Sequence, residues 1–121
     1  MILIVCLVYP LNCLELQQSQ EKKLPLVINT WDFVVSTEAA RKYLHKHPND
    51  SLNALVEGIN ACERINCEHL VGIGGQQNYR GDSILHALIV DGKNLNLGAV
   101  AAMSNINDAI RVAKHVLVNT G

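Results

Sequence analysis

Two cysteines and a histidine form the densest group of reactive side chains in the sequence. Cys62 and Cys67 enclose four residues, and His69 follows close behind. In an oxidising compartment such a pair predicts a short-loop disulfide. A zinc site is one alternative, because thiolate and imidazole are common zinc ligands, but no fourth ligand stands at a finger-like spacing. Free thiols are the third interpretation.

A second place for chemistry is the glycosylation sequon Asn49-Asp50-Ser51. Its position just ahead of a predicted helix favours an exposed asparagine. Aspartate in the middle position makes the sequon an inefficient acceptor. The sequence therefore predicts glycosylation at Asn49 and leaves its occupancy open.

The length and composition limit the size of the protein and the classes of partner that it can bind. The chain has 121 residues, which allows at most one modest domain. Its 10 basic and 11 acidic residues give a net charge of −1, so no basic field is available for nucleic acid or a membrane surface. A hydrophobic content of 49% is typical of a globular chain and too high for a disordered one. No motif predicts a cofactor or a resident metal.

The first nine residues are almost wholly apolar. This run is too short to span a bilayer but fits the core of a secretory signal peptide, which we predict over residues 1–20. A first strand is the alternative, because no Lys or Arg precedes the run and no Ala-x-Ala cleavage site follows it. Cys6 and Cys13 would leave with the leader or lie at its edge.

The elements that would position these side chains begin at residue 24. The sequence predicts a strand over residues 24–31 that begins at Pro25. Proline is tolerated at the start of a strand because no backbone N–H is needed there for a hydrogen bond to a neighbouring strand. A first helix is expected over residues 37–45, and a second begins at about residue 50. Apolar residues recur in the second helix at helical period and predict one buried stripe, made of Leu52, Leu55, Val56, Ile59 and Cys62.

The second half of the chain predicts an antiparallel hairpin and a third helix. Residues 84–90 form an apolar strand, expected to be buried on both faces apart from His86. Asp91-Gly92 favours a tight turn into residues 95–99, which alternate at period two. The third helix is expected from about Asn105. The fold class is therefore α+β. The predicted helices and strands are too few to complete a sheet and its covering layers, so we expect them to form only part of a larger fold.

Four segments, in order along the chain, resemble the glycosylasparaginase branch of the N-terminal-nucleophile hydrolases. Each segment alone is weak, but their order and spacing together are specific. They are residues 25–33, which end in Thr-Trp-Asp-Phe; residues 53–67, with both cysteines; residues 71–75, Val-Gly-Ile-Gly-Gly; and residues 85–117, which open with Leu-His-Ala-Leu.

The resemblance implies a four-layer αββα sandwich, of which residues 24–121 would supply only the N-terminal part. It also implies an amidohydrolase that cleaves the amide between N-acetylglucosamine and asparagine during glycoprotein degradation in the lysosome. Family members cut themselves within a His-Asp-Thr segment, and the freed threonine then attacks the substrate amide with its own α-amine as base. The resemblance further points to the disulfide between Cys62 and Cys67 and to a dimer of cleaved αβ units.

None of that catalytic machinery stands in this sequence. It has no His-Asp-Thr segment, and its Asp-Ser pairs at 50–51 and 82–83 do not match the family's cut site. The arginine and aspartate that hold the amino-acid end of the substrate belong to the family's second subunit. We therefore expect no catalytic residue in this chain, and no activity without the missing C-terminal β-chain portion.

The resemblance does assign two substrate-binding residues. Trp31 matches the family's tryptophan at the end of the first strand, which lines the pocket for a glycoasparagine-type substrate, and Phe33 matches its neighbour. The alternative for Trp31 is a core anchor, which is the usual place of a large aromatic side chain.

Several positions depart from the family pattern. Leu70 stands where a serine commonly precedes the glycine-rich run, and leucine cannot form a hydrogen bond there. His86 replaces an aspartate, while Ser104 and Asn105 replace basic residues. These changes favour the alternative of a catalytically inactive secreted relative that acts as a binding or structural protein. An asparaginase or isoaspartyl peptidase is a further alternative, since the wider family includes both.

Overall fold

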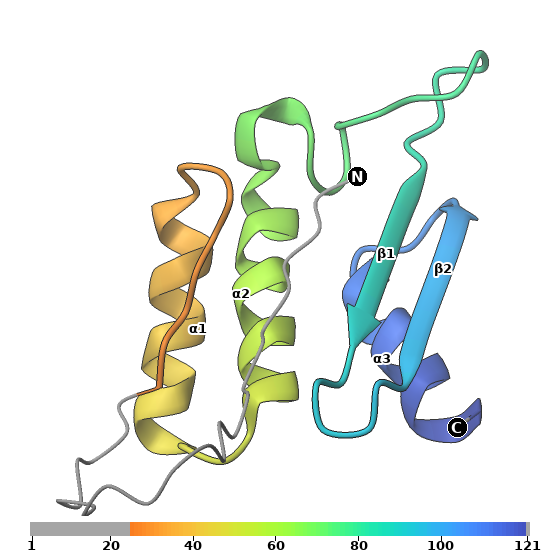
Figure 1. Ribbon diagram of the computed structural model, residues 1–121. Helices are drawn as coiled ribbons and strands as arrows, with labels where there is room; N and C mark the ends of the chain where they lie inside the picture. Colours follow the sequence, from red (N-terminus) through yellow and green to blue (C-terminus); the bar gives the residue numbers. More distant parts are fainter. Residues whose placement is uncertain (1–24, 121) are drawn as a thin grey trace, which may run out of the picture.

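The computed structural model describes residues 25–120 (Figure 1). The elements follow the order α1 (Val34–Lys46), α2 (Ser51–Ile65), the short 3₁₀ turn η1 (Cys67–His69), β1 (Leu85–Val90), β2 (Leu97–Met103) and α3 (Ala109–Thr120). The predicted signal peptide, with Cys6 and Cys13, lies outside the described residues. Among the helices between residues 25 and 120, none combines the length and the apolar character that a bilayer crossing requires.

α1 begins one turn earlier than the sequence predicted. The predicted start was Thr37, but the helix begins at Val34 and runs to Lys46. The carbonyl of Phe33 accepts the first hydrogen bonds, from the backbone nitrogens of Ser36 at 3.0 Å and Thr37 at 3.2 Å. Phe33 is buried, so its packing fixes the start of the helix without a side-chain cap.

α2 confirms the predicted second helix. It begins at Ser51, and the Asp50 carboxylate accepts a hydrogen bond from the Asn53 nitrogen at 3.2 Å, as an N-cap does. The predicted stripe points inward: Leu55 and Val56 belong to the main core, and Leu52 and Ile59 pack against it. α2 ends at Asn66, which adopts the left-handed conformation.

The strand predicted over residues 24–31 is wrong for the described part, residues 25–31. These residues form no strand and instead run beside α1 (Figure 1). A strand needs a neighbour to accept and donate its backbone hydrogen bonds. Within residues 25–120 the only sheet is the two-stranded β1–β2 ladder, and this segment does not join it.

β1 and β2 form the predicted antiparallel hairpin, but its turn is not a tight Asp-Gly turn. Val90 pairs with Leu97, so the connection is longer than predicted. The Asp91 nitrogen donates to the Asn96 carbonyl at 2.9 Å, and the Leu95 nitrogen donates to the Asp91 carbonyl at 2.8 Å. Leu95 in this loop takes a positive φ of 62°.

The hairpin has one covered face and one open face. Ile89 packs against α3 in the main core and is buried, whereas Leu97 on the other face is 53% exposed. β1 was expected to be buried on both faces, and this prediction is wrong for residues 25–120. α3 covers only one side of the hairpin (Figure 1). The helices and this antiparallel pair agree with the α+β class.

α3 begins at Ala109, four residues after the predicted start at Asn105. Its buried residues complete the main core, which contains Leu55, Val56, Ile89, Ile110, Ala113 and Leu117. The helix lies so close to β2 that a Cβ atom on Gly98 would stand 2.1 Å from the Ala113 carbonyl oxygen. Glycine at position 98 therefore sets the distance between helix and strand.

Candidate functional site

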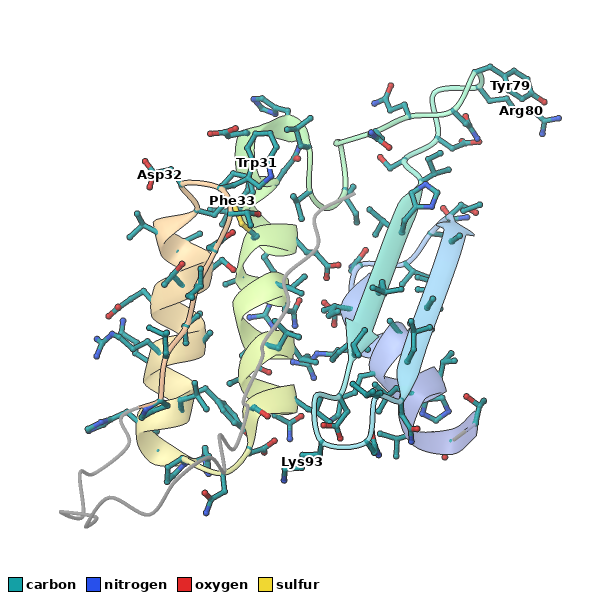
Figure 2. The ribbon with its side chains drawn as sticks, in the orientation of Figure 1. Trp31, Asp32, Phe33, Tyr79, Arg80 and Lys93 are labelled. Carbon is teal, nitrogen blue, oxygen red and sulfur yellow. A yellow bond between two sulfur atoms is a disulfide. The ribbon has the colours of Figure 1, made fainter. Side chains whose placement is uncertain are left out.

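Trp31 and Phe33 form a stacked aromatic pair at one end of the α1–α2 layer (Figure 2). Their ring centroids lie 6.0 Å apart, and the ring planes differ by 13°. A narrow turn holds them, because the Phe33 nitrogen donates to the Trp31 carbonyl at 2.8 Å. The structure thus brings together the two residues that the sequence assigned to substrate binding.

The two rings have different surroundings. Phe33 is 5% exposed and packs with Cys62, Cys67 and Val71 in a small second core. Trp31 is 49% exposed and lies outside that core. Phe33 therefore supports the ring of Trp31, and Trp31 presents a free aromatic face to solvent.

Beside Trp31 lies an open cavity of about 410 Å³, called here the Trp31 cavity. The Asn29 side chain contributes to its wall, and its Oδ1 accepts a hydrogen bond from the Trp31 nitrogen at 3.2 Å. Its Nδ2 is buried and has no hydrogen-bond partner within the described chain. The lining residues are Val27, Ile28, Asn29, Trp31, Asp32, Phe33, Val34, Thr37 and Glu38.

Asn29 is a functional candidate that the sequence analysis missed. A buried amide without a partner is costly, and a bound polar group would relieve that cost. The signal in the sequence was a lone amide at the end of an apolar segment, residues 26–28. The cavity thus offers the exposed aromatic ring of Trp31, and it would gain an amide donor if the Asn29 side chain turned its Nδ2 toward the cavity; the two groups suit a small substrate with polar and apolar sides.

The walls of the Trp31 cavity carry no activated nucleophile. Thr37 is the hydroxyl among the lining residues, and it donates to the Phe33 carbonyl at 3.5 Å. The Glu38 carboxylate is held by Arg41 at 2.7 Å, and that contact lowers the pKa of Glu38. The cavity can bind and orient a ligand, but a reacting group would have to come from elsewhere.

The other reactive side chains fill structural roles. Ser83 of the second Asp-Ser pair accepts a hydrogen bond from the Gly74 nitrogen at 2.9 Å, and Ser51 opens α2. The His86 Nδ1 accepts from the Ala102 nitrogen at 3.2 Å, beside the irregular pairing between Leu85 and Ala87. His86 thus supplies an acceptor where the ladder is interrupted.

A disulfide joins Cys62 and Cys67, with Cα atoms 5.2 Å apart. It contradicts the zinc and free-thiol alternatives, because both sulfurs are used in one covalent bond. The bond ties the last turn of α2 to η1 and lies against Phe33, beneath the aromatic pair (Figure 2). Leu70, directly after η1, is 49% exposed.

A second cavity, of about 540 Å³, lies beside the start of α3. Its cation, Arg111, is already paired with Glu57 at 2.9 Å and with Asp108 at 3.7 Å. These ion pairs neutralise the charge that would attract an anionic ligand. The cavity therefore offers less for recognition than the Trp31 cavity does.

The family model described as asparaginase matches residues 6–121. The chain therefore belongs to the asparaginase family, a group of hydrolases. The Mus musculus protein named N(4)-(beta-N-acetylglucosaminyl)-L-asparaginase is 41% identical over 97 residues, which are 80% of this chain and 28% of the mouse protein.

Two further relatives show the range of names in the family. A Drosophila sechellia protein, provisionally given the same enzyme name, is 37% identical over 90% of this chain and 28% of its own length. An Arabidopsis thaliana protein, provisionally named isoaspartyl peptidase/L-asparaginase 3, is 38% identical over 78% of this chain and 26% of its own length. The chain thus spans about a quarter of the length of the curated relatives it matches.

Proposed function

We propose that this chain is the N-terminal portion of an amidohydrolase that cleaves the amide between N-acetylglucosamine and asparagine. The nucleophilic threonine and the residues that hold the amino-acid end of the substrate belong to a β-chain portion outside this sequence. The main observation that supports the proposal is the Trp31 cavity. Its lining residues can bind a ligand, but they include no activated nucleophile, so the nucleophile has to come from another part of the protein. The name of the mouse relative, at 41% identity, supports the choice of substrate.

The open face of the hairpin supports the proposed αββα sandwich. Leu97 is 53% exposed, and Leu88 and Val90 on the same face are only half-buried. Apolar side chains on one face of a sheet need a covering layer. In the proposal, a second sheet from the β-chain portion covers this face, and the completed αβ units pair as dimers.

We place the protein in the secretory pathway, with the lysosome as its destination. The disulfide between Cys62 and Cys67 supports this, because disulfides persist in oxidising compartments and are rare in the cytosol. The apolar run over residues 1–9 is the proposed core of the leader.

Within the cavity, Trp31 and Asn29 contact different parts of the substrate. The exposed indole face packs against the apolar side of the substrate. On substrate binding the Asn29 side chain turns toward the cavity, and its Nδ2, which has no partner among the described residues, donates to a substrate oxygen. Phe33 keeps the indole in place from below. Catalysis then depends on how well this wall aligns the scissile amide with the threonine from the missing portion.

A chimera tests this function directly. Residues 25–120 would replace the corresponding segment of the mouse enzyme, and release of aspartate from glycoasparagine would be measured. We expect turnover, with a KM about tenfold higher in the Trp31→Ala chimera and nearly unchanged in Trp31→Phe, because one aromatic contact is worth about 1.4 kcal/mol. A folded, self-cleaved chimera that releases no aspartate would refute the proposal.

A substitution at Leu70 tests the alternative that this protein is a catalytically inactive relative. If the leucine removes a necessary hydroxyl, the chimera with Leu70→Ser should gain activity that the unaltered chimera lacks. The Arabidopsis relative favours isoaspartyl peptides as the competing substrate. Comparing kcat/KM for glycoasparagine, asparagine and an isoaspartyl dipeptide in the same chimera decides among the three.

A further inference from the structure

Asn49 lies in the turn between α1 and α2 and is exposed (Figure 1, the lower end of the two helices). It is the acceptor of the sequon Asn49-Asp50-Ser51. A glycan is bulky and must project into solvent, so an acceptor in a folded chain has to be exposed. The turn meets this requirement.

The hydrogen bonds that hold this turn use the neighbours of Asn49. The Asp50 carboxylate accepts from the Tyr43 hydroxyl at 3.0 Å, from the Asn53 nitrogen at 3.2 Å and from the Asn53 Nδ2 at 2.7 Å. The Asp50 nitrogen donates to the His47 carbonyl at 3.1 Å. A substituent on the Asn49 amide would therefore disturb none of the bonds that cap α2.

We propose that Asn49 carries an N-linked oligosaccharide on the α1–α2 turn. In the transfer, the Asn49 Nδ2 forms a bond to the anomeric carbon of the first N-acetylglucosamine of a lipid pyrophosphate-linked oligosaccharide. The bond from that carbon to the pyrophosphate oxygen breaks, the lipid pyrophosphate leaves, and a base of the transferase takes the amide proton. The inference rests on the proposed entry into the secretory pathway.

The position of the turn keeps the glycan away from the other surfaces described above. α1 has 13 residues, which corresponds to a helix about 20 Å long. The Trp31 cavity lies at the start of this helix, and Asn49 lies beyond its end. The open hairpin face is on a different layer from α1 (Figure 1). The glycan would shield the α1–α2 turn and leave the cavity open.

The test is expression of the full chain in cultured animal cells behind a proven heterologous leader. Peptide mass spectrometry after N-glycosidase treatment in heavy-oxygen water would locate any labelled aspartate. We expect one glycan, attached at Asn49. The Asn49→Gln and Ser51→Ala variants should lack it, and the Ser51→Thr variant should carry it on a larger fraction of its molecules. Asn94→Gln is the matched control, because Asn94 is also exposed in a turn but belongs to no sequon.

Exported chains that lack a glycan at Asn49, in the Ser51→Thr variant as well, would overturn the proposal. A parallel arm uses the chain's own N-terminus. A chain that stays in the cytosol in this arm but is glycosylated behind the heterologous leader would refute the proposed secretion and leave the Asn49 site standing. Circular dichroism of each variant confirms that it is folded.

Discussion

Glu63 on α2 reaches the start of α3, where its Oε1 lies 3.4 Å from the backbone nitrogen of Ile110. The first nitrogens of a helix have no partner within the helix, so this carboxyl stabilises α3 from outside. Its other oxygen, Oε2, is buried and has no partner among the described residues. The contact joins two residues that are 47 positions apart in the sequence, one on α2 and one on α3.

The stability of the fold should depend on the protonation of Glu63. The pKa of Glu63 is raised from 4.5 to about 7, mainly by burial and to a smaller extent by the Asp108 charge, while the hydrogen bond from the Ile110 N–H and the Arg111 charge oppose the shift. Between these values the folded chain keeps a proton that the unfolded chain releases. The free energy of unfolding should therefore fall from pH 5 to pH 8, by about 2 kcal/mol for this group.

Urea unfolding of wild type and Glu63→Gln at pH 5 and pH 8 checks this prediction. The glutamine variant should lose the fall in stability, because its amide does not titrate. Glu57→Gln is the control: Glu57 also contacts the start of α3, through Arg111, but its side chain is more exposed, and this variant should keep the wild-type pH dependence. Equal slopes in wild type and Glu63→Gln would contradict the assignment.

Gly98 should be among the least replaceable residues of the hairpin. A Cβ atom there would stand 2.1 Å from the Ala113 carbonyl oxygen and 2.6 Å from the Leu117 nitrogen, both of which are backbone atoms. Gly98→Ala should lower the free energy of unfolding by roughly 3 kcal/mol, because α3 must move away from β2. Ala99→Val, one position along on the open face, should change it by less than about 0.5 kcal/mol. Similar losses in the two variants would show that helix and strand are not in close contact.

The disulfide should stabilise the second core. Its loss in the Cys62→Ala/Cys67→Ala double variant should lower the free energy of unfolding by about 2 kcal/mol, the value expected for closing so short a loop. Wild type unfolded in the presence of reductant should behave in the same way. Alkylation of either cysteine in the native protein without reductant would show that the bond is absent.

Substitutions of Phe33 and Trp31 by alanine should differ in their effects on the free energy of unfolding. Phe33→Ala removes a ring that is 5% exposed and should lower the free energy of unfolding by roughly 3 kcal/mol. Trp31→Ala removes a half-exposed ring and should lower it by about 1 kcal/mol or less. Thermal denaturation of the two variants measures the difference. A larger loss for Trp31 would restore the alternative that Trp31 is a core anchor.

The sequence by itself determined the elements whose signals are local. α2 formed where apolar residues recur at helical period after Asp50, because a stripe and a capping carboxylate act within a few residues of each other. The hairpin likewise follows from two apolar runs close together in the chain. The four family segments could also be identified in the sequence, and the family match over residues 6–121 confirms the family that they indicated.

Only the tertiary structure decided the features that depend on a distant partner. Residues 25–31 have the composition of a strand, but composition cannot supply the neighbouring strand that a ladder needs. β1 is apolar on both faces, yet α3 covers only one of them. Glu63 looks like an ordinary surface residue of a helix until α3 packs over it and its carboxyl is buried. Burial and pairing depend on which segments meet in space, and spacing along the chain does not specify that.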